Sequence, residues 1–333
     1  MYILVTGGSG MLGQAVIEQL RQAGHRVRNF DLKPHPDPAV ENHVGDLRSA
    51  SDAAAACAGV DAVVHTASVI NLAVGKPRIV YDVNVTGTQH MIEACRQQGV
   101  RRLVYTSSLD VVFDGTPIRN GDERLPYARQ FFDYYGETKA EAEKLVLAAN
   151  GIDGVYTCSL RPTSVYGPND RVRFPTILKS VRQSGTFARF GGSPATHTHV
   201  YSVNVAHAHR LAVEALDAGS PLAGQAYFIT DHPPTDFVDF YLPYFDALGL
   251  QYRVTTIPLP LAQTLAFVSE TTRRLRPSRE GDDSALSRYV VSLLSRECWF
   301  SHAKAARDFG YAPIISRQDA FETNLAWLRQ QGF

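Results

Sequence analysis

The stretch YILVTGGSGMLGQAVIEQL, residues 2–20, decides the fold. It opens with a short apolar run typical of a buried strand, and after Met11 its apolar residues recur at the spacing of an amphipathic helix. Between these two segments, Gly7, Gly10 and Gly13 stand at regular intervals. The stretch therefore predicts a strand, a tight glycine-rich turn and a helix that begins near Met11.

The glycine-rich turn has the pattern of a phosphate-binding loop. One glycine turns the chain tightly off the strand, a second lets a diphosphate approach the backbone, and a third lets the helix pack close to the strand. The free N–H groups at the start of the helix then face the phosphates. Because the glycines follow a predicted strand and open a predicted helix, we expect a dinucleotide to bind there. The residues expected at its phosphates are Gly7, Gly10, Met11, Leu12 and Gly13.

An acidic residue, Asp31, ends the second predicted strand. A carboxylate at this place accepts hydrogen bonds from both hydroxyls of the adenine ribose and repels a 2′-phosphate. The sequence therefore predicts NAD as the cofactor rather than NADP. Arg28 and Lys33 keep NADP open, because either side chain could turn toward a phosphate.

Strands and helices alternate along the first half of the chain, which predicts parallel strands joined by helical crossovers. The strand-like runs are residues 2–6, 25–30, 61–67, 101–108 and 154–162. We expect an α/β fold with a doubly wound parallel sheet, formed by a dinucleotide-binding domain over residues 1–165 and completed by later segments near 200–230. A smaller, mostly helical domain is expected over residues 166–333.

Composition and charge exclude several classes of partner. The 333 residues carry 33 Lys+Arg and 33 Asp+Glu, and this balance argues against a nucleic-acid partner, which needs a broad basic face. No two of the four cysteines form a close pair, so neither a disulfide framework nor a zinc cluster is expected, and a cytoplasmic location fits.

His207 and His209 stand two apart on a predicted helix and point in different directions, so no metal site is expected. No segment is long and apolar enough to span a membrane.

Tyr135 and Lys139 are four residues apart and share one face of a predicted helix. A neighbouring ammonium group favours the phenolate, so we expect Lys139 to lower the pKa of Tyr135 and make it a usable proton acceptor. Ser107 and Ser108 end the preceding strand, at the edge of the sheet where ligands bind. One of these hydroxyls is expected to hold a reacting oxygen near Tyr135, and the other to be structural.

Together these motifs resemble the short-chain dehydrogenase/reductase superfamily in its extended form. The matching segments are TGGSGMLG, the GDL of residues 45–47, VVHTAS, NVTGT, YTSS and RPTSVYGP, in the family's order. The resemblance implies a Rossmann domain with a C-terminal substrate domain. It implies catalytic roles for Ser108, Tyr135 and Lys139, and Ser107 remains an alternative to Ser108. It also implies that Lys139 binds the nicotinamide ribose. It further implies that Asp46 and Leu47 flank the adenine, that Thr66, Ala67 and Ser68 line the middle of the cofactor, and that Pro162 and Val165 contact the nicotinamide.

Within the superfamily, the segments SSLDVVFDG, NGDERLPY and HVYSVNVAHAH are similar to the 3β-hydroxysteroid dehydrogenases, especially the decarboxylating sterol-4-carboxylate 3-dehydrogenase branch. Sugar-nucleotide dehydratases place Asp and Glu after the catalytic Ser/Thr, whereas this chain has Leu109 and Asp110. Sugar-nucleotide epimerases often carry an Arg-Asp pair where this chain has His197 and Thr198. The resemblance therefore implies a small, apolar, sterol-like substrate that is oxidised at its 3β-hydroxyl, with loss of CO₂ if a C4 carboxylate is present.

Other functions and partners stay open at this point. A 2-alkyl-3-oxoalkanoate reductase, or another NAD(P)-dependent reductase of an apolar ketone, would use the same residues, whereas a dinucleotide-sensing regulator would usually lack the Tyr–Lys pair. Residues 259–276 predict either an amphipathic lid or a helix that makes peripheral contact with a membrane. Superfamily relatives suggest a homodimer by analogy. The pocket walls are expected at Val69–Ile70, Phe131–Phe132, Tyr166 and residues 258–275.

Overall fold

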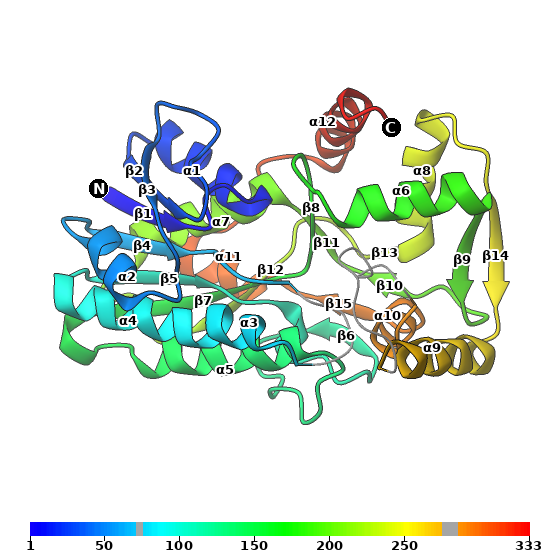
Figure 1. Cartoon of the computed structure of the whole chain (residues 1–333), viewed down its shortest axis with the longest axis horizontal. Coiled ribbons are helices and arrows are strands. Elements are labelled where there is room, and N and C mark those ends of the chain that lie inside the picture. The colour runs from blue at the N-terminus through cyan, green and yellow to red at the C-terminus, as the bar shows by residue number, and fades with distance from the viewer. Residues whose placement is uncertain (71–75, 275–285) are drawn as a thin grey trace.

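A seven-stranded parallel sheet forms the centre of the larger part of the protein, as predicted (Figure 1). The computed structural model describes residues 1–70, 76–274 and 286–333. The strand order is β12-β7-β5-β4-β1-β2-β3. The strands span β1 (Tyr2–Thr6), β2 (Arg26–Asp31), β3 (Glu41–Val44), β4 (Ala62–His65), β5 (Arg102–Thr106), β7 (Tyr156–Pro162) and β12 (Ala226–Ile229). Strand β12 comes late in the sequence and pairs with β7 at one edge of the sheet.

Helices cover both faces of this sheet, because its central strands are apolar on both sides. In β1, Ile3 and Val5 pack toward one face, and Leu4 packs toward the other. Helices α1 (Met11–Gln22), α7 (Ser202–Ala215) and α11 (Ala303–Phe309) lie on the first face. Helices α2 (Ala50–Cys57), α4 (Gly87–Gln98) and α5 (Tyr134–Ala148) lie on the second. The result is the three-layer arrangement that the alternating pattern predicts.

The chain reverses its direction of travel across the sheet between β1 and β4, which are neighbours. From β1 the chain proceeds outward through β2 and β3, and it then returns to β4 and continues through β5 to the other edge. At such a point the connections that leave the two strands diverge, and a crevice opens at the carboxyl ends. The glycine-rich turn of residues 7–10 and the residues that follow β4 lie at this crevice.

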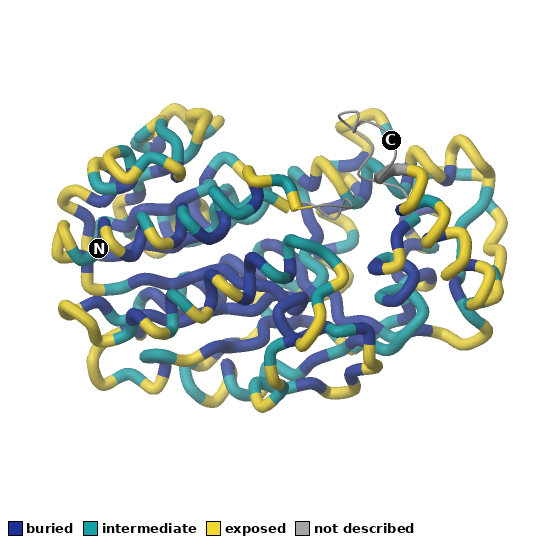
Figure 2. The backbone as a smooth tube through the Cα atoms, turned by 60° about the horizontal axis from the view of Figure 1, so that its bottom comes forward, coloured by how far each residue is buried: buried dark blue, intermediate teal, exposed yellow. Residues whose placement is uncertain are grey.

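The remainder of the chain forms a smaller part built from short sheets and helices. Its strands are β6 (Ile118–Gly121), β8 (Ser164–Tyr166), β9 (Thr186–Phe190), β10 (Thr196–His197), β11 (His199–Tyr201), β13 (Thr235–Asp236), β14 (Arg253–Ile257) and β15 (Cys298–Phe300). Its helices are α6 (Arg173–Ser184), α8 (Phe237–Ala247), α9 (Leu259–Arg274), α10 (Arg288–Leu294) and α12 (Arg317–Gln330); helix α3 (Arg78–Tyr81) precedes α4. Figure 2 shows buried backbone at the centre of each part and exposed backbone at the periphery.

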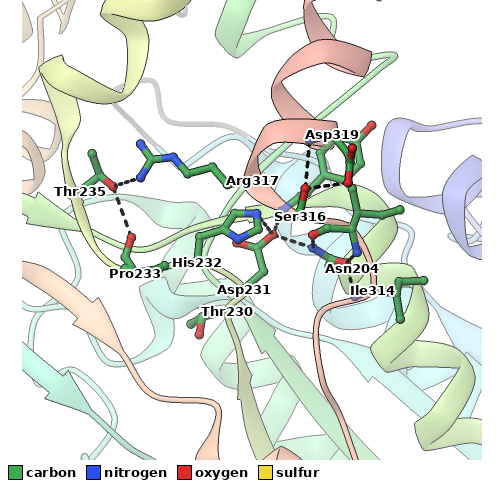
Figure 3. A network of polar contacts seen from close by, with 12 residues as sticks. Asn204, Thr230, Asp231, His232, Pro233, Thr235, Ile314, Ser316, Arg317 and Asp319 are labelled. Atoms are coloured by element: carbon green, nitrogen blue, oxygen red, sulfur yellow. Dashed lines mark hydrogen bonds and ion pairs between the residues drawn. The ribbon is translucent and has the colours of Figure 1, made fainter.

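A polar network joins the C-terminal segment to the sheet (Figure 3). The Asn204 amide nitrogen, at the start of α7, donates to Asp231 at 2.9 Å, and its oxygen accepts from the backbone N–H groups of Ile314 and Ile315, each at 2.9 Å. Asp231 follows β12 and also accepts from the Tyr201 backbone N–H at 2.6 Å. Burial raises the pKa of Asp231 to about 6. These contacts fix the chain just before α12.

Among the helices of the described ranges, we find no run that is both long and apolar enough to cross a bilayer. The predicted amphipathic stretch forms α9 up to Arg274. The last residues of that stretch, Leu275 and Arg276, lie outside the described residues.

Candidate functional site

A cavity of about 600 Å³ opens at the carboxyl ends of the central strands. Every predicted site residue lines it, although these residues come from segments far apart in the sequence. They are Gly7, Gly10, Met11, Leu12, Gly13, Asp31, Asp46, Leu47, Thr66, Ala67, Ser68, Ser108, Tyr135, Lys139, Pro162 and Val165. The structure therefore brings these residues together in one place, while their individual roles stay predictions.

The glycine-rich turn at one end of the cavity needs its glycines for different reasons. Gly7 has φ of +69°, and a Cβ there would lie 2.8 Å from the Ala67 Cα. A Cβ on Gly13 would lie 2.1 Å from the Gly7 carbonyl oxygen, so only glycine lets α1 approach the turn. A Cβ on Gly10 would meet only that same oxygen, at 3.2 Å. Gly10 also lines the cavity, so its lack of a side chain leaves room for a diphosphate at the start of α1.

Asp31 is held beside this turn by two backbone N–H groups. Ser9 donates to one carboxylate oxygen at 3.1 Å, and Lys33 donates to the other at 3.2 Å. The Arg28 guanidinium was one of the two groups that could have bound the 2′-phosphate of NADP. It instead donates to Glu41 at 2.8 Å and to the Ala56 carbonyl at 2.7 Å. Asp31 itself lines the cavity, so its carboxylate is available for the role predicted for it at the adenine ribose.

A chain of buried hydrogen bonds lies beneath the segment that follows β4. The Thr6 hydroxyl lies 2.6 Å from His65 Nδ1, and the Thr88 hydroxyl lies 3.0 Å from His65 Nε2. Burial lowers the pKa of His65 to about 3, so its ring is neutral and donates from one nitrogen while accepting at the other. Thr6 also accepts from the Ala67 N–H at 3.1 Å, so this chain of hydrogen bonds positions segment 66–68 in the cavity wall.

Asn84 binds Val69, the next residue along the chain, through both the oxygen and the nitrogen of its side-chain amide. It lies in a single π-helical turn, Asp82–Thr86, at the start of α4. Its oxygen accepts from the Val69 N–H at 2.8 Å, and its nitrogen donates to the Val69 carbonyl at 3.1 Å and to the Thr138 hydroxyl at 3.0 Å. Asn84 is part of the motif NVTGT, but its role as a bridge to α5 was not predicted, because the bridge depends on a contact between distant helices.

Tyr135 and Lys139 lie on the first turns of α5, which starts where the Asp133 carboxylate accepts from the Gly136 N–H at 2.6 Å. The Lys139 ammonium group donates to the Thr106 carbonyl and lies 4.1 Å above the Tyr105 ring. Only 2% of Lys139 is exposed, and burial lowers its pKa to about 7.

The prediction that Lys139 lowers the pKa of Tyr135 is not what the structure shows. Burial raises the pKa of the Tyr135 phenol well above its usual value, and the charge of Asp110 raises it further. The hydroxyls of Ser108 and Ser68 act in the opposite direction. Because burial also lowers the pKa of Lys139, the positive charge that would favour a phenolate at Tyr135 is weakened in the protein alone.

Ser108 and Ser107 face different surroundings. The Ser108 hydroxyl donates to the Asp110 carboxylate at 2.6 Å, on the side of Tyr135. Ser107 lies on the side of Glu143, whose ionised form it helps to stabilise. Glu143 is fully buried in an ion pair with Arg161, which is a structural contact beneath the sheet edge. The geometry therefore favours Ser108 as the serine that meets a ligand.

The walls of the cavity differ from those expected. Val69 and Ile70 line it as predicted, whereas Phe131, Phe132 and Tyr166 do not. Phe132 stacks on Phe113, Phe131 joins the apolar cluster around Phe113, and Tyr166 is buried among aromatic side chains of the smaller part. None of residues 258–272 lines the cavity, and residue 275 lies outside the described residues. Lining residues that were not predicted include Asp110, Asn169, Arg171, Arg173, Tyr289 and Leu293.

His209, one of the two histidines considered for a metal site, has structural partners instead. His209 donates from Nδ1 to the Val205 carbonyl at 2.8 Å, and its Nε2 lies 2.7 Å from the Thr106 hydroxyl. Across the ranges that the structure describes, no three His, Cys, Asp or Glu side chains are grouped as a metal site requires.

Comparisons with known proteins give this geometry a context. A sequence model described as the 3-beta hydroxysteroid dehydrogenase/isomerase family matches residues 4–261. A 3-beta-hydroxysteroid dehydrogenase of Mycolicibacterium neoaurum is 36% identical over 327 residues, which cover 96% of this chain and 88% of that protein. The decarboxylating sterol-4-alpha-carboxylate 3-dehydrogenase of Mus musculus is 35% identical over 320 residues, covering 96% of this chain and 88% of that protein. A solved short-chain dehydrogenase/reductase superfamily protein of Agrobacterium tumefaciens with bound NAD shares the fold at 23% identity, with a TM-score of 0.75 over 99% of this chain and 98% of that one.

Proposed function

Since the chain belongs to the 3-beta hydroxysteroid dehydrogenase/isomerase family of oxidoreductases acting on CH–OH groups, we propose that it oxidises the 3β-hydroxyl of a sterol-like substrate with NAD. The observation that carries the proposal is the single cavity that combines the glycine-rich turn and Asp31 with Ser108, Tyr135 and Lys139.

The cofactor end of the cavity supports NAD as the hydride acceptor. The turn at Gly10 leaves room for the diphosphate, and Asp31 lines the cavity beside this turn, where its carboxylate would accept from the ribose hydroxyls. When bound, NAD⁺ supplies an acceptor for the hydride and a positive charge at its nicotinamide. Asp46, Leu47, Pro162 and Val165 line the remaining length of the cofactor in this proposal.

Tyr135 accepts the proton of the substrate alcohol, and Ser108 holds the same oxygen in place. The O–H bond of the alcohol breaks and its proton passes to the phenolate oxygen, while the C3–H bond gives up its electron pair as a hydride and the carbinol becomes a ketone. In this proposal Lys139, whose ammonium group donates to the Thr106 carbonyl, holds the nicotinamide ribose. A buried phenol needs added positive charge before it ionises, so proton acceptance by Tyr135 follows binding of the cofactor.

A carboxylate at C4 of the substrate would be lost after oxidation. The product would then be a β-keto acid, whose C4–CO₂ bond breaks as the electron pair moves into the new ketone to give an enolate, which is then protonated. The oxygen of that enolate lies where Ser108 and Tyr135 hold the carbinol oxygen, so the same two hydroxyl groups stabilise it. This branch of the proposal rests on the resemblance to the mouse enzyme.

A substrate panel tests the proposal. The purified chain is supplied with NAD⁺ or NADP⁺ and with a 3β-hydroxysteroid, its 4-carboxy derivative or a 2-alkyl-3-hydroxy acid, and turnover is read at the nicotinamide absorbance. We expect turnover of the sterols with NAD⁺, with CO₂ released only from the 4-carboxy compound. Turnover of the 2-alkyl-3-hydroxy acid alone would instead support the alternative reductase, and binding of NAD without any turnover would support a regulator.

Two associations belong to the proposal as well. Helix α9 exposes a group of large apolar side chains, namely Leu261, Leu265, Phe267 and Val268. We propose that this helix makes peripheral contact with a membrane that holds the substrate, which co-sedimentation with phospholipid vesicles tests.

We also propose a homodimer, by analogy with the superfamily, which sedimentation equilibrium tests.

A further inference from the structure

Two arginines, Arg171 and Arg173, line the cavity where the chain passes from β8 to α6. Arg161, which is buried beneath the sheet edge, pairs with Glu143 at 2.5 Å. Arg173 is also partly buried, yet it forms no ion pair with any residue that the structure describes. Its guanidinium group has five N–H donors, and it reaches the Val165 carbonyl only at a long 3.4 Å. The cavity wall therefore holds a cation that is available to a ligand.

The side chains around Arg173 do not offset its charge by pairing with it. Asp170 is the acid closest to it in the sequence, but the Asp170 carboxylate accepts from three backbone N–H groups at the start of α6, at 2.9, 2.9 and 3.0 Å. The charge of Arg173 acts on His197, His199 and Tyr241, which are all buried. Burial lowers the pKa of both histidines, to about 4 for His197, and raises the pKa of the phenol, so all three are neutral near pH 7.

Arg173 lies beside the segment that is expected to contact the nicotinamide. Val165, whose carbonyl it approaches, lines the cavity and is one of the two predicted nicotinamide contacts. The nicotinamide of NAD⁺ is itself positive, and two positive charges repel each other strongly where little water screens them. An anion close to both would be favoured. Because a hydride passes directly from substrate to nicotinamide, a negative group near the reacting carbon of the substrate meets this requirement.

Apolar side chains line the cavity on either side of the two arginines. Ile70 and Val172 are large, exposed apolar residues of this wall, and Val69 and Leu293 line it as well. These side chains suit an apolar body, whereas a guanidinium group binds both oxygens of a carboxylate through its planar fork of donors. The wall as a whole therefore suits an apolar molecule that carries one carboxylate.

On the basis of the function proposed above, we propose that Arg173 binds a carboxylate on the carbon next to the carbinol, so that the substrate is an apolar β-hydroxy acid. A 3β-hydroxysteroid with a C4 carboxylate has this arrangement, and so does a 2-alkyl-3-hydroxy acid. Arg171 is exposed in the same wall and adds attraction at longer range. Because an ion pair stabilises the carboxylate itself, the contact acts on binding and does not speed a later loss of CO₂. Its effect is therefore expected in KM rather than in kcat.

The test compares an acid with its uncharged counterparts. Oxidation with saturating NAD⁺ gives kcat and KM for a 3β-hydroxysteroid-4-carboxylate, for its methyl ester and for the sterol without the carboxyl group. The wild type should have a lower KM for the acid than for the ester. Arg173→Gln should raise the KM for the acid at least ~10-fold, which corresponds to about 1.4 kcal/mol. Its kcat, and its KM for the two neutral compounds, should change by less than about threefold.

Two further variants separate the carboxylate contact from general damage. Arg173→Lys keeps the charge but not the planar fork, so its KM for the acid should lie between those of the wild type and Arg173→Gln, and it carries the test if the glutamine variant does not fold. Arg182→Gln is the matched control, because it removes the same charge from the same helix at a position that does not line the cavity. Its KM for the acid should equal that of the wild type.

The affinity for the cofactor separates a substrate contact from a cofactor contact. In Arg173→Gln the Kd for NAD⁺, measured by calorimetry, should be unchanged, because Arg173 serves the substrate. Weaker binding of NAD⁺, an unchanged KM for the acid, or an equal rise in KM for the acid and the ester would each overturn the carboxylate site.

The remaining outcomes distinguish the inference from the function on which it rests. Turnover of the plain sterol without turnover of the acid would overturn the carboxylate site and leave the proposed function standing. Oxidation of a 2-alkyl-3-hydroxy acid alone, with a KM that depends on Arg173, would support the carboxylate site and reject the sterol as substrate. If the wild type oxidises none of these compounds, the proposed function fails, and tighter binding of the acid than of the ester to the protein with NADH then decides whether the carboxylate site exists.

Discussion

The Tyr289 hydroxyl donates to Asp110 at 2.6 Å, although 179 residues separate the two along the chain. Tyr289 lies on α10, and Asp110 lies just beyond the end of β5. This contact connects the smaller part of the protein to the wall of the cavity beside the proposed catalytic serine.

Loss of that hydroxyl is expected to destabilise the protein. A hydrogen bond from a buried hydroxyl to a carboxylate contributes about 1.5–3 kcal/mol, and its loss leaves the Asp110 oxygen without that donor. Tyr289→Phe should therefore lower the free energy of unfolding by about 2 kcal/mol in a urea titration with an unchanged slope. A variant as stable as the wild type would show that the contact contributes nothing.

Gly13 should tolerate no side chain. Its Cβ would lie 2.1 Å from the Gly7 carbonyl oxygen, which is backbone and has no room to move. We expect Gly13→Ala to lose NAD binding, measured by titration of the nucleotide against protein fluorescence. Gly192→Ala is the matched control, because nothing lies within 4 Å of a Cβ there, and its affinity for NAD should equal that of the wild type. Full NAD affinity in Gly13→Ala would mean that the turn does not hold the cofactor.

Asp31 should decide between the two nicotinamide cofactors. Replacing its carboxylate with a hydroxyl in Asp31→Ser removes the repulsion of a 2′-phosphate and the acceptor for the ribose hydroxyls. The ratio of kcat/KM with NAD⁺ to kcat/KM with NADP⁺ should fall at least ~10-fold. Asp37→Ser is the control, because Asp37 pairs with Arg21 and does not line the cavity. Equal ratios in the two variants would argue against this role of Asp31.

Asp231 should make stability depend on pH. Its pKa in the folded protein, about 6, lies above the ordinary value of 3.8, so the folded state binds the proton more tightly than the unfolded state. The associated stability is present below about pH 4 and is lost as the pH rises through 6. Relative to Asp231→Asn, the wild type should lose about 2 kcal/mol of unfolding free energy between pH 4 and pH 8, measured in urea at each pH. A difference between the two proteins that does not vary with pH would contradict this.

The sequence predicted the sheet and the cofactor end of the cavity because both depend on local pattern. The glycine spacing, Asp31 and the strand ends place their residues at the carboxyl edge once the strands are parallel, and the family assignment is confirmed by the comparisons. The contacts of Asp110 could not be predicted in this way. Its partner Tyr289 reaches it only through the packing of α10, which no spacing in the sequence encodes.

The electrostatics of Tyr135 show a second limit. Its spacing from Lys139 correctly predicted a shared helix face, and Lys139 was expected to lower the pKa of Tyr135. Burial changes the result, since it raises the pKa of the phenol and lowers that of the amine to about 7. The extent of burial depends on the whole fold, so its effect on the two pKa values could not be weighed in advance against the attraction between the two groups.

Tyr135→Phe tests the central claim most directly, because it deletes one oxygen and leaves the rest of the cavity in place. In a single turnover with saturating NAD⁺ and a 3β-hydroxysteroid, the rate of NADH formation should fall by about 10²–10⁴-fold, while the Kd for NAD⁺ changes by less than about threefold. Formation of NADH at the wild-type rate by this variant would contradict the account.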